Sequence, residues 1–386
     1  MTEIRVRESL SEPGVVVNPD GGGLASRALL LACRGVVRPL IRHYPIHPVT
    51  MPLASTVVDG LARLRPHPAG VEREGVQLNG FRMEIVRPAG ARRALRDGAV
   101  MYMHGGGFFI CGLDSHRPVA AALARRTGLP VLNVEYRQLP STPIAGSIDD
   151  CLTAYRWLLR HGADPARVVF AGDSAGGFLT FATALRAIAS GLPAPAGLVG
   201  LSPALDLDCE AKRDYVNIGR DAYIPLSAME QMVRYGASPA AQDGSHGTVH
   251  RIGQHGNGRG AEMPQHLRTR GVGQCGNGRD KGGAAPHTDA GYGGLDPALS
   301  PVNGDLAGLP PALLIVGEDE LLRYDCELMA RRLTAVGVPN SLELWRGQVH
   351  AFMSIVPGLP ESRAALGRVA RFVRARIESE RAARTA

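Results

Sequence analysis

A five-residue stretch, Gly172-Asp173-Ser174-Ala175-Gly176, places the strongest restriction on the fold of this chain. It follows the apolar run Val168–Ala171 and precedes the helix-like stretch Gly176–Ala189. A strand that turns directly into a helix needs glycines around the bend, because a Cβ there would collide with neighbouring backbone. The pattern predicts a strained turn that exposes the Ser174 hydroxyl as a nucleophile. The alternative is an ordinary serine in a glycine-rich turn.

Strand-like apolar runs alternate with helix-like segments along most of the chain. The expected strands are 99–103, 131–136, 168–171, 196–201, 312–316 and 341–345, and the expected helices are 119–126, 148–161, 176–189, 324–336 and 362–377. This alternation predicts an α/β fold with a mostly parallel central sheet flanked by helices. Ahead of it, Asn79-Gly80 inside Gly70–Pro88 predicts a hairpin.

A second glycine cluster, His104-Gly105-Gly106-Gly107-Phe108, directly follows the strand expected at 99–103. Such a run leaves backbone N–H groups bare, so they can meet the oxyanion that forms when a serine attacks a carbonyl carbon. We therefore expect the N–H groups of Gly105, Gly106 and Ala175 to form an oxyanion hole. A phosphate cradle is the rival interpretation, but the chain has no GxxxxGK[ST] sequence.

A serine nucleophile needs a base, and the base needs an acid to orient it. His350 follows the strand expected at 341–345 and is the sole histidine after residue 287. Three neighbouring carboxylates, Glu318, Asp319 and Glu320, follow the strand expected at 312–316. The sequence thus offers a nucleophile, an acid and a base in the order that strand ends of such a sheet would supply.

At this point the chain resembles the hormone-sensitive-lipase-like carboxylesterase family of the α/β-hydrolase fold. The matching pieces, in family order, are HGGGF (104–108), YR (136–137), DD (149–150), GDSAGG (172–177), LSPALDL (201–207), DPALSP (296–301), GLPPALLIVGEDELL (308–322) and HAF (350–352). The resemblance implies a triad of Ser174, Glu320 and His350, with Asp319 as the alternative acid and Glu318 in a supporting or surface place. Arg117 departs from the family, which has an aspartate beside His116.

The resemblance implies cleavage of short- to medium-chain acyl esters by a two-step acyl transfer, with Phe108 and Phe109 lining the substrate pocket. The substrate would be a small-molecule ester, and this chemistry needs neither a metal nor an organic cofactor. The alternatives are an amidase or deacetylase on the same triad, a ligand-binding protein of the same fold without turnover, and a chain that fails to fold.

Residues 1–65 are expected to form N-terminal cap helices, and residues 66–386 the catalytic domain. A segment at about 242–294 interrupts that domain, holding 15 of the 48 glycines and 5 of the 12 histidines. It has no hydrophobic periodicity, and we expect a disordered insertion there. The alternatives are a sequence read in the wrong frame and weak metal binding, the latter by His246, His250, His255 and Cys275.

The formal net charge of +7 is spread along the chain and comes almost wholly from arginine, so we expect no nucleic-acid partner. The stretch Leu24–Ile41 is interrupted by arginines, which predicts an amphipathic helix rather than a membrane span. That helix either packs on its own protein or acts as a lid or at a membrane surface. Irregularly spaced cysteines and the absence of an apolar leader predict a cytoplasmic protein. The sequence is compatible with a homodimer but does not predict the oligomeric state.

Overall fold

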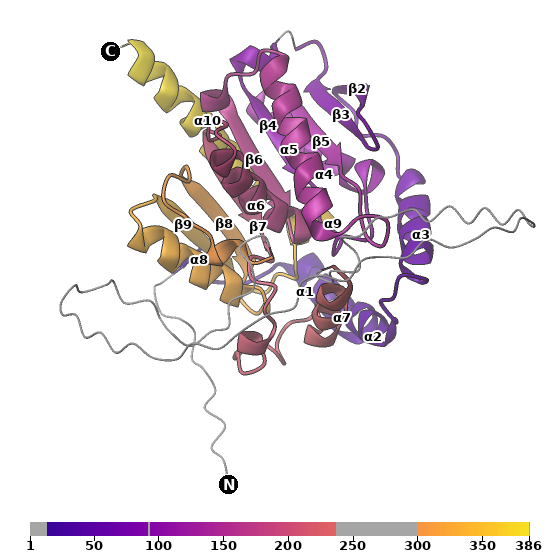
Figure 1. The fold of residues 1–386 in the computed structure, drawn as a ribbon. Coiled ribbons are helices and arrows are strands. Elements are labelled where there is room, and N and C mark those ends of the chain that lie inside the picture. Colours follow the sequence, from indigo (N-terminus) through magenta and orange to yellow (C-terminus); the bar gives the residue numbers. More distant parts are fainter. Residues whose placement is uncertain (1–13, 92, 237–298, 386) are drawn as a thin grey trace, which may run out of the picture. The chain divides into compact units, whose positions relative to one another are not determined.

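The computed structural model describes residues 14–91, 93–236 and 299–385 (Figure 1). These residues form one nine-stranded sheet in the order β1-β9-β8-β7-β6-β4-β5-β3-β2. The strands are β1 (Val15–Val16), β2 (Val71–Gln77), β3 (Arg82–Pro88), β4 (Ala99–Met103), β5 (Val131–Glu135), β6 (Val168–Asp173), β7 (Gly197–Leu201), β8 (Ala312–Gly317) and β9 (Asn340–Trp345).

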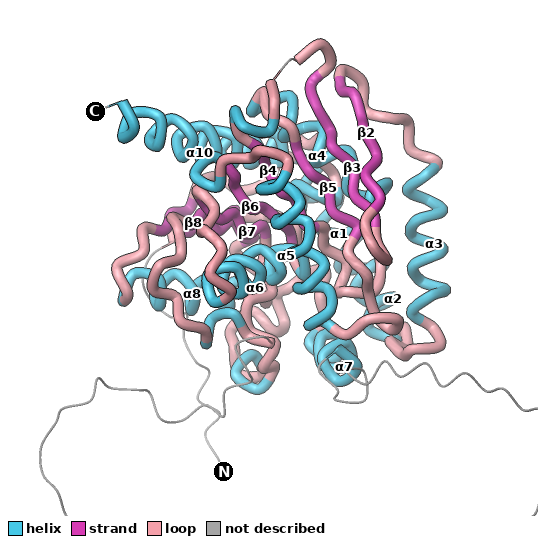
Figure 2. Tube along the Cα trace, turned by 45° about the horizontal axis from the view of Figure 1, so that its top comes forward, coloured by secondary structure: helices cyan, strands magenta, loops and turns pink. Residues whose placement is uncertain are grey.

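Neighbouring strands are parallel from β1 through β9, β8, β7, β6 and β4 to β5. The strand β3 pairs antiparallel with both β5 and β2. The expected hairpin is therefore confirmed, with Gln77 opposite Arg82 beside the Asn79-Gly80 turn. The mostly parallel α/β sheet is confirmed as well. Because parallel strands need crossover connections, the chain places a helix after almost every strand (Figure 2).

Helices cover both faces of the sheet. The helices are α1 (Leu24–Ala32), α2 (Arg38–His43), α3 (Met51–Arg63), α4 (Leu113–Thr127), α5 (Ile144–Arg160), α6 (Ala175–Ala189), α7 (Leu226–Gly236), α8 (Arg323–Ala335), α9 (Phe352–Ile355) and α10 (Pro360–Thr385). A π-helical turn, Cys33–Val37, joins α1 to α2. The short α7 was not expected from the sequence.

The core lies in two layers, one on each side of the sheet, because alternate strand residues point to opposite faces. Met101 and Met103 of β4 belong to the layer under α5, α6 and α8. Val100 and Tyr102 of the same strand belong to the layer under α4 and α10. Every residue of β4 is buried, which explains why the central strands read as continuous apolar runs.

The helices expected at 119–126, 148–161, 176–189, 324–336 and 362–377 all form, most of them with longer ends. Within residues 1–65 the structure has α1, α2 and α3, joined by short connections. The segment expected to be an insertion, 242–294, lies outside the described residues, and so do His246, His250, His255 and Cys275. In the described ranges, no helix combines the length and apolar character needed to cross a bilayer.

Candidate active site

Ser174 stands at a sharp turn between β6 and α6. Its backbone angles, φ 53° and ψ −118°, lie in a region that non-glycine residues rarely adopt. Its N–H donates to Leu201 O at 2.9 Å, which ties the turn to the end of β7. From Val168 to Ala184, Ser174 alone is not buried. The turn therefore presents one accessible hydroxyl on an otherwise buried strand–helix unit.

The two glycines that flank Ser174 are required by close backbone approach. A Cβ on Gly176 would lie 1.9 Å from Met103 O, and a Cβ on Gly172 would lie 2.3 Å from Gly176 O. Neither contact can be relieved by a side-chain rotation, because both partners are backbone. The glycines thus let α6 start directly against the end of β4.

Four adjacent parallel strands end beside this turn. Ser174 follows β6, Ser202 follows β7, Glu320 follows β8 and His350 follows β9. The carboxyl ends of parallel strands meet at one edge of the sheet, so segments far apart in the sequence converge there. Glu320 Oε2 lies 2.8 Å from His350 Nδ1, and both side chains are buried.

The three neighbouring carboxylates have different partners. Only Glu320 turns inward to His350. Asp319 forms an ion pair with Arg220 at 3.1 Å, and Glu318 forms one with Arg346 at 2.8 Å. The geometry therefore favours Glu320 over Asp319 as the partner of the imidazole.

Glu320 is held from a second side. Its Oε1 accepts hydrogen bonds from Ser202 Oγ at 2.7 Å and from the Gly317 N–H at 2.6 Å. Ser202 Oγ in turn accepts the Ala351 N–H at 3.1 Å. Ser202 is fully buried at a positive φ of 47°, and it links the acid to the loop that carries His350. Ser202 lies in the LSPALDL stretch, but no local pattern marked it as part of the site.

Another buried carboxylate, Asp221, shapes the electrostatics of His350. Asp221 accepts hydrogen bonds from the N–H groups of Tyr223, Ile224 and Leu321. Burial favours neutral imidazole, but the Glu320 hydrogen bond and the charges of Glu320, Asp221 and Asp173 outweigh it and raise the pKa of His350. The Tyr223 ring lies 5.6 Å from the His350 ring.

The Gly105 N–H, which the sequence predicts to be an oxyanion donor, has a partner within the site. It donates to Asp173 Oδ1 at 3.1 Å. The N–H groups of Gly106 and Gly107 donate no hydrogen bond within the described part of the chain. Both residues have positive φ, 115° and 59°, and a Cβ on Gly106 would lie 2.1 Å from Ile110 O.

Asp173 joins the glycine loop to the serine turn, a role that its position in the Gly172–Gly176 motif does not predict. Besides Gly105, it accepts a hydrogen bond from Tyr102 Oη at 2.6 Å and lies 3.2 Å from His116 Nε2. Burial opposes ionisation, but His116 and Tyr102 overcome it and lower the pKa of Asp173. Burial lowers the pKa of the adjacent His104 to about 3, so that ring is neutral.

Comparisons with known proteins agree with this geometry. The family described as alpha/beta hydrolase fold matches residues 100–265 and 288–354. The chain belongs to this family. The carboxylesterase/phospholipase LipF of Mycobacterium tuberculosis is 31% identical to this α/β hydrolase over 365 residues, covering 93% of this chain and 84% of LipF.

Two further comparisons place this α/β hydrolase beside hormone-sensitive lipase. Human hormone-sensitive lipase is 30% identical over 185 residues, which cover 47% of this chain and 17% of the human protein. A crystal structure of an esterase from the bacterial hormone-sensitive lipase family has a TM-score of 0.69 and 27% identity, covering 92% of this chain and 99% of that one. The resemblance inferred from the sequence motifs is confirmed.

The two phenylalanines after the glycine loop differ in this α/β hydrolase. Phe108 is fully buried, at a positive φ of 63°, with its ring 5.3 Å from the Phe178 ring. It therefore packs in the core, and its contact with substrate stays a prediction. Phe109 is half-buried, and its N–H donates to Gly106 O at 3.2 Å. Phe109 stays a candidate for contact with substrate.

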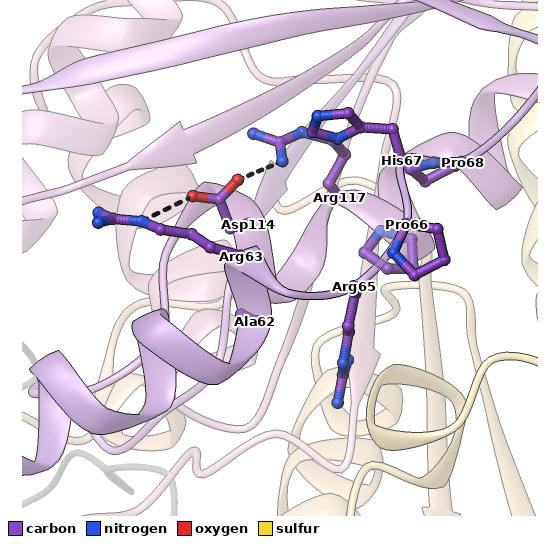
Figure 3. A pocket seen from close by; sticks show the side chains of 9 residues that line it. Ala62, Arg63, Arg65, Pro66, His67, Pro68, Asp114 and Arg117 are labelled. Carbon is purple, nitrogen blue, oxygen red and sulfur yellow. Dashed lines mark hydrogen bonds and ion pairs between the residues drawn. The ribbon is translucent and has the colours of Figure 1, made fainter.

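A shallow depression lies at the end of α3, separate from the serine turn. Figure 3 shows its lining, in which Asp114 bridges Arg63 and Arg117. Arg117, which departs from the family pattern, also pairs with Glu84 at 3.0 Å and is buried. None of Ser174, Glu320 and His350 lines the depression. It is a charged surface feature rather than the site of the proposed chemistry.

Across the described residues, no group of three or more His, Cys, Asp or Glu side chains could hold a metal ion. Five cysteines in these residues are free thiols, and four of them are buried. Burial raises the pKa of Cys111, the half-buried one, to about 12, so it stays a neutral thiol at physiological pH.

Proposed function

We propose that this α/β hydrolase cleaves short- to medium-chain acyl esters of small molecules through an acyl-enzyme intermediate. Ser174 is the nucleophile, His350 the base and Glu320 the acid. The observation that carries the proposal is the 2.8 Å contact between Glu320 and His350 at the same sheet edge as the strained, accessible Ser174. The names of the similar proteins, among them a carboxylesterase and an esterase, support the ester class.

The first half of the reaction forms the acyl-enzyme. Glu320 is an acceptor, so the His350 proton sits on Nδ1 and leaves Nε2 free to take the Ser174 proton. Ser174 Oγ attacks the ester carbonyl carbon, and the carbonyl oxygen becomes an oxyanion. His350 then gives its proton to the alcohol oxygen as the carbon–oxygen bond breaks.

The second half of the reaction releases the acid. His350 Nε2 takes a proton from water, and the hydroxide oxygen attacks the acyl carbon. The proton returns to Ser174 as the acyl–serine bond breaks. We assign the oxyanion donors to the N–H groups of Gly106, Gly107 and Ala175, because Asp173 engages the N–H of Gly105.

The cap is proposed to include helices α1–α3, within residues 1–65. Its support is the contact that the π-helical turn Cys33–Val37 and α2 make with the loop before α7. Arg34 Nη2 donates to Arg220 O at 2.7 Å, and Arg38 Nη2 donates to Ile218 O at 3.3 Å. This loop also holds Tyr223 beside His350. A cytoplasmic location, a homodimer and the absence of a nucleic-acid partner stay predictions of the sequence.

The test is turnover of a p-nitrophenyl ester series from acetate to laurate by the wild type and by Ser174→Ala. We expect the variant to lose activity by at least about 10⁴-fold while melting at the same temperature. A matched control, Ser190→Ala at the far end of α6, keeps full activity. Equal rates for wild type and Ser174→Ala would contradict the mechanism.

The same assay separates the alternatives. Faster turnover of matched p-nitroanilides than of esters would make the chain an amidase or deacetylase. A well-folded wild type that binds esters without turnover would make it a ligand-binding protein.

A further inference from the structure

Exposed apolar side chains gather on the N-terminal helices. Of the twelve large apolar residues that are exposed in the described part of the chain, nine lie between residues 24 and 64. Each of the nine exposes between 52% and 86% of its surface. They are Leu24, Leu31, Val36, Leu40, Val49, Leu53, Val57, Leu61 and Leu64, and we call them the N-terminal apolar face. Such concentration marks an interaction surface.

Helix α3 shows the arrangement most clearly, because it exposes a row of large apolar side chains. Leu53, Val57 and Leu61 recur every four residues, so they share one side of the helix, and that side is exposed. Between Pro52 and Leu61 the exposed side carries no charge. The opposite side, which packs towards α4, carries Ser55 and Asp59 half-buried, and the two buried residues of α3 are Met51 and Ala62. A helix packed only for its own fold would bury the leucines instead.

The charge around this face is positive. Residues 14–68 contain six arginines and two aspartates, and five of the arginines are exposed. Arg65 follows α3 and points away from the Asp114–Arg117 ion pair, which leaves its guanidinium open to solvent (Figure 3). The face therefore combines leucines with arginines at its border. This combination matches an anionic lipid surface, where apolar side chains enter the acyl region and arginines meet phosphate groups.

Two other candidate occupants of the N-terminal apolar face fit less well: a second copy of the chain, and residues 237–298 of the same chain. A second copy would bring the same arginines against each other across a two-fold axis, which costs electrostatic energy. Residues 237–298 contain seven large apolar residues, and six Lys and Arg stand against five Asp and Glu there. That composition complements neither the apolar character nor the charge of the face.

We propose that helices α1–α3 dock this protein on the surface of an anionic phospholipid bilayer. The inner side of the same helices reaches the candidate active site. Cys33 packs in one cluster with Ala222, and the next residue, Tyr223, contacts the His350 ring. Docking would thus hold esters dissolved in the bilayer about one helix diameter, roughly 10 Å, from this loop.

The test measures binding without catalysis, so its outcome is independent of the proposed function. The full-length Ser174→Ala protein is floated with vesicles of phosphatidylcholine containing 30% phosphatidylglycerol, and with phosphatidylcholine alone. We expect strong flotation with the anionic vesicles only, weakened by salt. Leu53→Ser/Leu61→Ser is expected to lower the vesicle partition coefficient by at least about tenfold. The matched control Val336→Ser, at an exposed valine after α8, keeps wild-type binding.

The charge contribution has its own pair of variants. Arg42→Gln/Arg65→Gln is expected to lower binding to the anionic vesicles by about tenfold, whereas Arg331→Gln on α8 leaves it unchanged. With an active enzyme, the leucine variant loses turnover of vesicle-embedded esters and keeps turnover of soluble p-nitrophenyl acetate.

Three results would overturn the proposal. One is a wild type that does not float with anionic vesicles. Another is a leucine variant that floats like the wild type. The third is a wild-type dimer in sedimentation without lipid that the leucine variant converts to monomer, which would assign the face to a second copy.

Discussion

At the strand-end site, polar side chains are buried and hydrogen-bonded, whereas on α3 the leucines are exposed and Asp59 is half-buried. Glu320 and Ser202 expose almost no surface, and each has hydrogen-bond partners within the site. Leu53 and Leu61 expose more than half of theirs, and no charge lies between them on that side. Both arrangements cost folding free energy if they serve only the fold.

This contrast indicates where catalysis and docking would each reside. A catalytic site needs groups held in one geometry, and buried hydrogen bonds supply it because a broken one leaves an unsatisfied group. A docking face needs only exposed apolar area and charge, so it tolerates changes in the individual side chains that supply them. Substitutions should therefore act through chemistry at the site and leave chemistry intact on the helices.

After Ser174→Ala, the greatest loss of turnover is expected from Glu320→Gln. An amide cannot hold the imidazole in the required tautomer and charge state, so kcat should fall on the order of 10³-fold. Asp319→Asn, whose parent carboxylate pairs with Arg220 on the surface, should change kcat by less than about twofold. Steady-state kinetics with p-nitrophenyl butyrate measures both. If Asp319→Asn were the damaging change, the acid assignment would be wrong.

The next prediction compares the stability changes caused by alanine at two glycines. Gly176→Ala forces a Cβ against Met103 O, and we expect it to destabilise the protein by about 2–3 kcal/mol and to abolish most activity. Gly60→Ala on the exposed side of α3 meets nothing within 4 Å, and it should stabilise the helix by about 0.5–1 kcal/mol. Urea unfolding reports both changes. A loss of stability in Gly60→Ala would show that the α3 surface is not open.

Ser202→Ala should have a smaller effect on turnover. Glu320 loses one donor and the Ala351 N–H loses its acceptor, so the acid and the His350 loop become less well positioned. We expect kcat to fall about tenfold with KM nearly unchanged. Ser341→Ala, at an exposed position in β9, is the control and should match the wild type. A change confined to KM would argue against a positioning role for Ser202.

The smallest expected change is a shift in the pH dependence of activity. His350 must be neutral to act as base, and its pKa is raised, so activity should fall with acid at a pH above the usual histidine value. Asp221→Asn removes a nearby negative charge that favours the imidazolium, so the acid limb of kcat/KM should move to lower pH. Asp305→Asn, in an exposed turn, should leave the limb in place. A shift to higher pH would contradict the electrostatic assignment.

Local patterns were enough to predict the elements that carry the site. The Ser174 turn, the glycine loop and His350 were identified because glycine spacing and strand–helix alternation act within a few residues of sequence. The same reasoning did not predict the surroundings of Phe108 and Gly105. Only the tertiary structure shows that Phe108 is buried against Phe178. The N–H of Gly105 donates to Asp173, a partner that glycine spacing does not predict.

Local properties of the sequence, periodicity and backbone sterics, were enough to predict the parallel α/β sheet and to single out Ser174 and His350. Which of Glu318, Asp319 and Glu320 pairs with His350 became visible only in the folded chain, because their partners lie far away in sequence. The tertiary structure also revealed Ser202 as the link between two loops, and it showed that α3 turns its leucines outward. In each case the deciding contact or exposure depends on which surfaces meet in three dimensions, and residue spacing does not encode that.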